Sequence, residues 1–293
     1  MTRALDLDAA LAYAERHGLQ AFVVQRGAEI AAEHYANGWS ADKPHALYSG
    51  TKSFWGVAAV AAQDDGLLAL DEPVGTTFAD WRSGEKAAVT LRDLLQLTSG
   101  IGFGGLGTAV PAYPKALATP LKTTPETTFT YGGIPLQVFG AVLAAKLAPR
   151  DLTPHAYLRE RILDPAGVAV ASWRSLADGT QPLPTGAFLT ARAWLTYGAF
   201  VRDGGTAGGR EIVARASLAR CFAGSAANPR YGLGWWLADG VVYASGAGGQ
   251  GLYIVPDADT AIVFGNASSY KHDAFLKRLL ARHAEPIELP PRS

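Results

Sequence analysis

The fold and the chemistry of this chain are indicated first by the stretch Tyr48-Ser49-Gly50-Thr51-Lys52-Ser53-Phe54-Trp55. It places a serine three residues before a lysine, where the apolar residues 54–62 begin a predicted helix. Side chains three residues apart lie on one face of a helix, so Lys52 would stand beside the Ser49 hydroxyl. A lysine in the first helical turn opposes the positive end of the helix dipole. That field, together with burial, would lower the pKa of Lys52 toward the range of a general base.

The Ser-x-x-Lys spacing does not single out this pair by itself, because the chain contains it three times. Ser83 and Lys86 lie in the polar stretch 81–86, which is predicted to be a solvated loop. Ser268 and Lys271 follow a loop-like segment, residues 265–267. Only Ser49 and Lys52 open a long apolar helix, and this context favours them as nucleophile and base.

Composition excludes several classes of function. The chain has 293 residues, 48% of them hydrophobic and 18% charged, with net charge +0 and pI near 7.0. This predicts a folded protein with a large core and no electrostatic attraction to nucleic acids or anionic membranes. Six histidines without metal-site spacing and a single cysteine, Cys221, predict no bound metal, no cofactor and no intrachain disulfide. The N-terminus lacks a signal-peptide pattern and no apolar run reaches the length of a membrane span, so we expect a cytoplasmic protein.

Strand-like segments stand at both ends of the chain and helical ones in the middle. The pattern predicts strands at 20–25, 29–35, 232–238, 241–245, 251–255 and 260–264, helices at 6–17, 52–65, 90–97, 135–148, 154–163, 189–201, 211–223 and 270–283, and irregular structure at 101–127. This order predicts an α+β fold in which an antiparallel sheet is built from both termini, flanked by helices, with a mainly helical lobe inserted. We expect one two-lobed domain over residues 1–293, with an α/β lobe of about 1–47 and 170–293 and a helical lobe of about 48–169.

Two glycine-rich segments match the Gly-x-Gly-x-x-Gly pattern, Gly102 to Gly107 and Gly246 to Gly251. A dinucleotide site needs a strand before the glycines and a helix after them, and neither segment has that context. Glycines at a strand edge also allow a substrate to approach closely, and their N–H groups could stabilise an oxyanion. The simpler interpretation of the second segment is a tight hairpin turn.

Taken in order, several segments resemble the serine β-lactamase-related family, which includes class C β-lactamases, DD-peptidases, family VIII esterases and 6-aminohexanoate-dimer hydrolases. The resemblance covers roughly residues 20–270. The segments that carry it are Leu47–Phe54, Leu70–Val74, Thr90–Ile101, Phe129–Tyr131, Tyr231–Trp236 and Gly248–Gln250.

The resemblance implies a β-lactamase/transpeptidase-like fold and an acyl-enzyme mechanism. Ser49 would be the nucleophile, and Lys52 and Tyr131 would share the acid and base work, with Lys52 helping to hold Tyr131 as a phenolate. The N–H groups of Ser49 and Gly249 would form the oxyanion hole. Residues Gly246, Ala247, Gly248 and Gln250 would bind the substrate.

Two departures from the family pattern bear on the substrate. Tyr131-Gly132-Gly133 stands where the lactamases have Tyr-x-Asn, and Gly246-Ala247-Gly248 stands where Lys-Thr-Gly is common. A charge-assisted hydrogen bond contributes about 1.5–3 kcal/mol, so the missing lysine should weaken carboxylate-bearing substrates by about tenfold to a hundredfold. We therefore expect an esterase or amidase acting on small substrates, with weak or absent β-lactamase activity.

Three alternatives stay open on the sequence. The chain could be a true β-lactamase or a penicillin-binding DD-peptidase. It could be a non-catalytic, ligand-binding relative of the fold, although it keeps all three catalytic side chains. It could also be a hydrolase in which His45, close to Ser49 in sequence, is the base. The pattern defines neither the substrate's acyl and leaving groups nor the oligomeric state.

Overall fold

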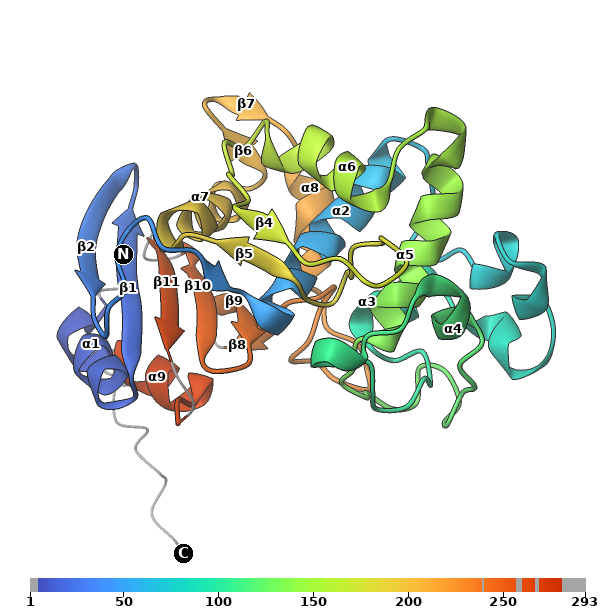
Figure 1. The fold of residues 1–293 in the computed structure, drawn as a ribbon, viewed down its shortest axis with the longest axis horizontal. Coiled ribbons are helices and arrows are strands. Elements are labelled where there is room, and N and C mark those ends of the chain that lie inside the picture. Colours follow the sequence, from blue (N-terminus) through green and yellow to red (C-terminus); the bar gives the residue numbers. More distant parts are fainter. Residues whose placement is uncertain (1–4, 239, 257–259, 267–268, 281–293) are drawn as a thin grey trace, which may run out of the picture.

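A six-stranded antiparallel sheet joins the two ends of the chain (Figure 1). The computed structural model describes residues 5–238, 240–256, 260–266 and 269–280. The strand order is β2-β1-β11-β10-β9-β8, with β1 Leu19–Arg26, β2 Glu29–Tyr35, β8 Trp236–Ala238, β9 Val241–Gly246, β10 Gln250–Val255 and β11 Thr260–Asn266. Pairing of β1 with β11 confirms the predicted sheet built from both termini.

Alternating side chains of the sheet enter two different apolar layers, as the two-residue period of a strand requires. On β1, Phe22 and Val24 pack with helices α1 (Leu7–Arg16) and α9 (His272–Leu279). Ala21 and Val23 point the other way, into the main core, which includes helix α7 (Ala191–Arg202). The sheet is therefore covered by helices on both faces (Figure 1).

The remaining elements lie mostly between β2 and β8 in the sequence. The helices are α2 Lys52–Asp64, α3 Leu91–Gln96, α4 Tyr113–Leu117, α5 Ile134–Leu147, α6 Pro154–Leu158 and α8 Arg215–Ala219. The small sheets pair β3 His45–Ala46 and β4 Ser172–Trp173 with β5 Ala187–Leu189, and β6 Thr206–Ala207 with β7 Arg210–Glu211. In Figure 1 helices α3, α4 and α5 lie to one side of the large sheet.

Several predicted boundaries differ from the structure. The strand predicted at 232–238 is β8, only Trp236–Ala238, because the glycines before it turn the chain against α2. The helix predicted at 211–223 is split into α8 and a 3₁₀ turn, Arg220–Phe222. The stretch predicted to be irregular contains the short helix α4. Residues 281–283 of the predicted last helix and Ser268 of the third Ser-x-x-Lys match lie outside the described residues.

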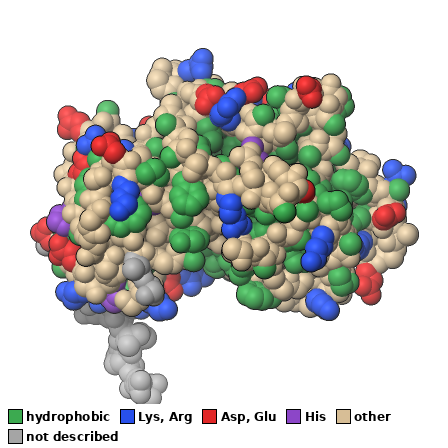
Figure 2. Space-filling view, viewed as in Figure 1, with side chains coloured by type: hydrophobic (Ala, Val, Ile, Leu, Met, Phe, Trp, Pro, Cys, Tyr) green, Lys and Arg blue, Asp and Glu red, His purple; other side chains and the backbone are tan. Residues whose placement is uncertain are grey.

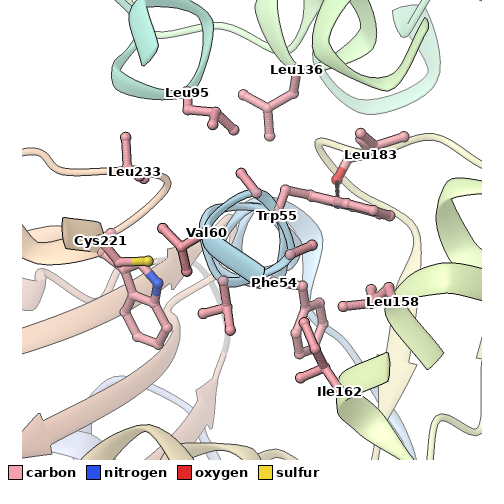
Figure 3. Packing of buried hydrophobic residues seen from close by; sticks show 14 of the residues in the cluster. Phe54, Trp55, Val60, Leu95, Leu136, Leu158, Ile162, Leu183, Cys221 and Leu233 are labelled. Atoms are coloured by element: carbon pink, nitrogen blue, oxygen red, sulfur yellow. Dashed lines mark hydrogen bonds between the residues drawn. The ribbon is translucent and has the colours of Figure 1, made fainter. Parts of the chain in front are cut away.

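Helix α2 lies at the centre of the core (Figure 3), and every residue from Lys52 to Ala62 is buried. Its glycine allows close packing: a Cβ added at Gly56 would lie 2.0 Å from the carbonyl oxygen of Leu233. Trp55 is fully buried and its indole N–H donates to the carbonyl of Leu183 at 2.6 Å. A helix buried on all sides cannot be amphipathic, which explains its continuous apolar sequence.

We expect Trp55→Phe to destabilise the protein more than Trp235→Phe, by about 1–3 kcal/mol. Both indoles are fully buried, but the Trp235 N–H has no hydrogen-bond partner among the described residues. The first substitution leaves the buried Leu183 carbonyl without its donor, whereas the second removes an unpaired donor. Urea unfolding followed by far-UV circular dichroism measures the difference, and equal losses would contradict this account of the Trp55 bond.

Candidate active site

The backbone around Ser49 is held in an unusual conformation that presents the serine to a cleft. Ser49 lies in a 3₁₀ turn, Tyr48–Thr51, immediately before α2. Tyr48 has a positive φ of 46°, a left-handed conformation that non-glycine residues adopt at an energetic cost. Ser49 is half-buried and lines a cleft of about 850 Å³.

Lys52 lies behind Ser49 and away from the solvent. Its Nζ is 3.0 Å from the Ser49 Oγ and 3.4 Å from the Pro184 carbonyl oxygen, and the side chain is only 1% exposed. Burial lowers the pKa of Lys52 to about 7, because a charged amine loses its hydration there. A substantial fraction of Lys52 is therefore neutral near pH 7 and able to accept the Ser49 proton.

Tyr131 completes the group. The Lys52 Nζ lies 4.8 Å from the centre of its ring, and Tyr131 lines the same cleft. Burial raises the pKa of Tyr131 above its ordinary value, and a side-chain hydrogen bond with Ser49 opposes this only in part. The raised pKa favours the protonated phenol and does not support the expected phenolate.

The characteristic stretch 90–101 positions Tyr131. Helix α3 begins with a capping box in which Thr90 and Asp93 bond each other's backbone N–H groups. The second carboxylate oxygen of the buried Asp93 accepts from the Thr98 hydroxyl at 3.2 Å. The carbonyl of Leu97, the residue before Thr98, accepts from the Thr130 N–H at 2.9 Å. The backbone of Thr130, next to Tyr131, is thus held at the C-terminal end of α3.

The predicted oxyanion and substrate segment forms the turn between β9 and β10. Gly246, Ala247, Gly248 and Gly249 line the cleft together with Ser49. Gly248 and Gly249 have positive φ values of 76° and 81°, and a Cβ at Gly249 would lie 1.9 Å from the Asn266 Oδ1. The turn therefore requires glycine here, for backbone conformation as well as for space.

Two candidates from the sequence are not brought to the cleft. The Gln250 side chain is 4% exposed, and its amide donates to the Asn266 carbonyl at 3.2 Å. Gln250 is the first residue of β10, and its side chain is directed into the protein interior. His45 is buried and stacked on Trp39 with ring centres 4.0 Å apart. Neither residue lines the cleft, and burial lowers the pKa of His45 to about 4.

The cleft also has a wall whose residues the sequence pattern did not predict to lie together. Trp236 and Tyr243 contribute rings, Ser245 and His272 contribute polar groups, and Arg230, Lys271 and Asp273 contribute charges. Arg230 and Asp273 approach to 3.4 Å. These residues come from three places in the last quarter of the chain, with no spacing that links them to Ser49. The paired tryptophans of residues 235–236 were the only available signal, and just the second of them faces the cleft.

Other classes of site find little support in the described part of the chain. No group of three or more His, Cys, Asp or Glu side chains is arranged to hold a metal ion there. No helix among the described residues is long and apolar enough to cross a bilayer. On the face drawn in Figure 2, acidic and basic side chains are interspersed and do not gather into a patch of one sign.

Comparisons with known proteins identify the fold and the family of the chain. Among solved structures, a beta-lactamase-like protein from Bacteroides dorei DSM 17855 superposes with a TM-score of 0.78 at 18% identity, covering 94% of this chain and 98% of the other. A family VIII carboxylesterase gives 0.73 at 16% identity, with 94% and 95% covered. A D-stereospecific amidohydrolase from a Streptomyces species gives 0.71 at 15%, with 95% and 99% covered. These likenesses show the fold. The Beta-lactamase family model matches residues 7–285, and the chain therefore belongs to the β-lactamase family.

Proposed function

We propose that this protein is a serine hydrolase that cleaves small esters or amides through an acyl-enzyme on Ser49. The observation that carries the proposal is the 3.0 Å approach of the buried Lys52 Nζ to the Ser49 Oγ. A hydroxyl becomes a useful nucleophile when an adjacent base accepts its proton. A lysine whose pKa is about 7 meets that need near neutral pH.

The residues allow a balanced sequence of steps. The Ser49 Oγ attacks the substrate carbonyl while its proton passes to Lys52, and the N–H groups of Ser49 and Gly249 hold the developing oxyanion. Tyr131 gives its phenolic proton to the leaving alcohol or amine as that bond breaks, and Lys52 returns a proton to Tyr131. Water then attacks the acyl-enzyme with the proton transfers reversed, which releases the acid and restores Ser49.

The esterase and amidase branch is favoured by what the cleft lacks. Gly133 has no side-chain amide where the lactamases have asparagine, and Gly246 has no side-chain cation where they have lysine. The carboxylesterase and the amidohydrolase found by structural comparison share this fold with a beta-lactamase-like protein, so the fold is compatible with ester and amide substrates as well as with β-lactams.

A β-lactamase or penicillin-binding activity is the second candidate, because the cleft does contain cations. Arg230 and Lys271 line the cleft, and neither belongs to the Gly246-Ala247-Gly248 segment. Arg230 already faces Asp273 at 3.4 Å, so part of its charge is compensated. A substrate carboxylate would therefore meet Lys271 first, which is solvent-exposed.

Ser49→Ala should abolish hydrolysis of 4-nitrophenyl butyrate, with a fall in kcat of about 10³-fold or more, because the nucleophile is removed. The matched control is Ser83→Ala, which alters an exposed serine with the same spacing to a lysine. Intact-protein mass spectrometry after fluorophosphonate treatment should show one adduct in the wild type and none in Ser49→Ala. No turnover and no adduct in the wild type would instead support a non-catalytic relative.

The pH dependence of kcat/KM should show a rising limb with an apparent pKa of about 7, since the base is the neutral form of Lys52 and that form increases with pH. Below about pH 6 the rate should fall tenfold per pH unit. Lys52→Arg keeps a cation but has no accessible neutral form, so it should lose about 10²- to 10⁴-fold in rate. Activity that survives in Lys52→Arg but is lost in His45→Ala would assign the base to His45.

Benzylpenicillin should be hydrolysed less efficiently than the ester, because Gly246 stands where a lysine would contribute a charge-assisted hydrogen bond of about 1.5–3 kcal/mol to the penicillin carboxylate. Mass spectrometry of the same incubation distinguishes the second candidate: a persistent penicilloyl adduct on Ser49 would indicate a penicillin-binding protein. Rapid turnover that is lost in Lys271→Ala would show that the exposed cation replaces the missing lysine.

A further inference from the structure

A second polar cluster lies at the edge of the cleft, apart from Ser49 and Lys52. The Ser245 Oγ is 2.8 Å from the His272 Nε2, and the His272 Nδ1 is 2.6 Å from the Tyr253 hydroxyl. The Tyr253 hydroxyl is also 2.6 Å from the Tyr270 hydroxyl. Ser245, Tyr270 and His272 line the cleft, whereas Tyr253 is fully buried. The chain of hydrogen bonds is thus anchored in the core through Tyr253, and its Ser245 end faces the cleft.

The sheet register explains how these groups meet. Ser245 on β9 stands opposite Gly251 on β10. A Cβ at Gly251 would lie 2.6 Å from the ring of Tyr253, so glycine leaves the space in which that ring lies. His272 is the first residue of α9, which packs on this face of the sheet. The position of Ser245 therefore depends on three elements, β9, β10 and α9.

A row of stacked rings links this cluster to the catalytic tyrosine. The ring centres of Tyr131 and Trp236 are 5.8 Å apart at 25°, and those of Trp236 and Tyr243 are 6.4 Å apart at 20°. Tyr243 then stacks on His272 at 5.7 Å and 27°. The wall therefore presents a run of aromatic side chains that begins beside Tyr131 and ends at the Ser245 hydroxyl.

The cluster is suited to binding and not to a second nucleophilic reaction. A serine acts as a nucleophile with histidine when a carboxylate stabilises the imidazolium that forms. Here the third group is an uncharged tyrosine, and burial lowers the pKa of His272 to about 4. The imidazole remains neutral and can only accept or donate a hydrogen bond, so Ser245 presents an oriented but unactivated hydroxyl.

We propose that Ser245 is a specificity-determining residue that binds a neutral hydrogen-bonding group, an amide or a hydroxyl, at the far end of an aromatic substrate moiety that packs against the Trp236 and Tyr243 side chains. His272 and Tyr253 act as positioning residues for its hydroxyl. This inference rests on the hydrolase function proposed above and narrows its substrates to esters or amides with an aromatic portion that ends in a neutral polar group.

Two pairs of esters test the proposal, one for each side of the scissile bond. The first pair is 4-nitrophenyl 4-acetamidobenzoate and 4-nitrophenyl 4-isobutylbenzoate; the second is 4-acetamidophenyl butyrate and 4-isobutylphenyl butyrate. Within each pair the ratio of kcat/KM reports only on the polar group. In at least one pair Ser245→Ala should lower the wild-type ratio about fivefold to tenfold, as expected for one neutral hydrogen bond. Ser245→Thr, which keeps the hydroxyl, should restore most of it.

Tyr253→Phe separates positioning from general damage to the fold. It should lower the same ratio and have little further effect when combined with Ser245→Ala, because both changes break one chain of hydrogen bonds. Ser40→Ala, at an exposed serine, should leave the ratio unchanged. A ratio that Ser245→Ala leaves unchanged in both pairs, whether or not the rates themselves fall, would overturn the proposal.

The wild-type protein distinguishes this result from failure of the proposed function. If it hydrolyses neither member of either pair and its Ser49 resists the fluorophosphonate, the hydrolase proposal fails and this inference fails with it. If it hydrolyses them with an unchanged ratio in Ser245→Ala, only the role of Ser245 is lost.

Discussion

The burial of the Lys52 amine behind Ser49 is the constraint on which the active site depends. In the described part of the chain its nitrogen meets neutral groups: a hydroxyl, a carbonyl oxygen and the face of a tyrosine. An ammonium without a carboxylate partner is costly in such a place, and the amine responds by a lowered pKa. The stability lost by burying a charge and the base that the proposed mechanism requires are therefore two consequences of one arrangement.

The surrounding backbone approaches α2 closely to maintain that burial. A Cβ at Gly234 would lie 2.4 Å from the Lys52 carbonyl oxygen, and one at Gly246 would lie 2.1 Å from the Leu47 carbonyl oxygen. Both glycines allow main chain to pack directly on the segment that carries the nucleophile. Water is excluded by backbone as well as by side chains, and the amine stays dry although Ser49, three residues earlier, faces the cleft.

Three consecutive carbonyls link this site to the core. Those of Pro182, Leu183 and Pro184 accept from the indole of Trp173, the indole of Trp55 and the amine of Lys52 respectively. Two of the donors, Trp55 and Lys52, belong to the first turn of α2. Packing in the centre of the helix and the position of the Lys52 amine are thus coupled through one short segment, so a core substitution near Trp55 would also disturb the candidate site.

Local sequence was enough to identify the parts of the site that local geometry determines. Ser49 and Lys52 are three residues apart on one turn, and the 90–101 stretch closes its own helix by a capping box, so both were predictable. The sheet from both termini was predictable too, because alternating apolar residues specify strands and their order limits the topology.

Long-range packing decided the rest. The Gln250 side chain turns into the sheet, while Ser245, Trp236 and His272 turn toward the cleft, and that choice follows from strand register and from where α9 docks. The high pKa of Tyr131 and the low pKa of Lys52 depend on how completely neighbours about 50 to 130 residues away exclude water. The sequence by itself determined which atoms can react; only the tertiary structure decided their protonation and the wall that a substrate meets, since both depend on contacts between segments that no local spacing specifies.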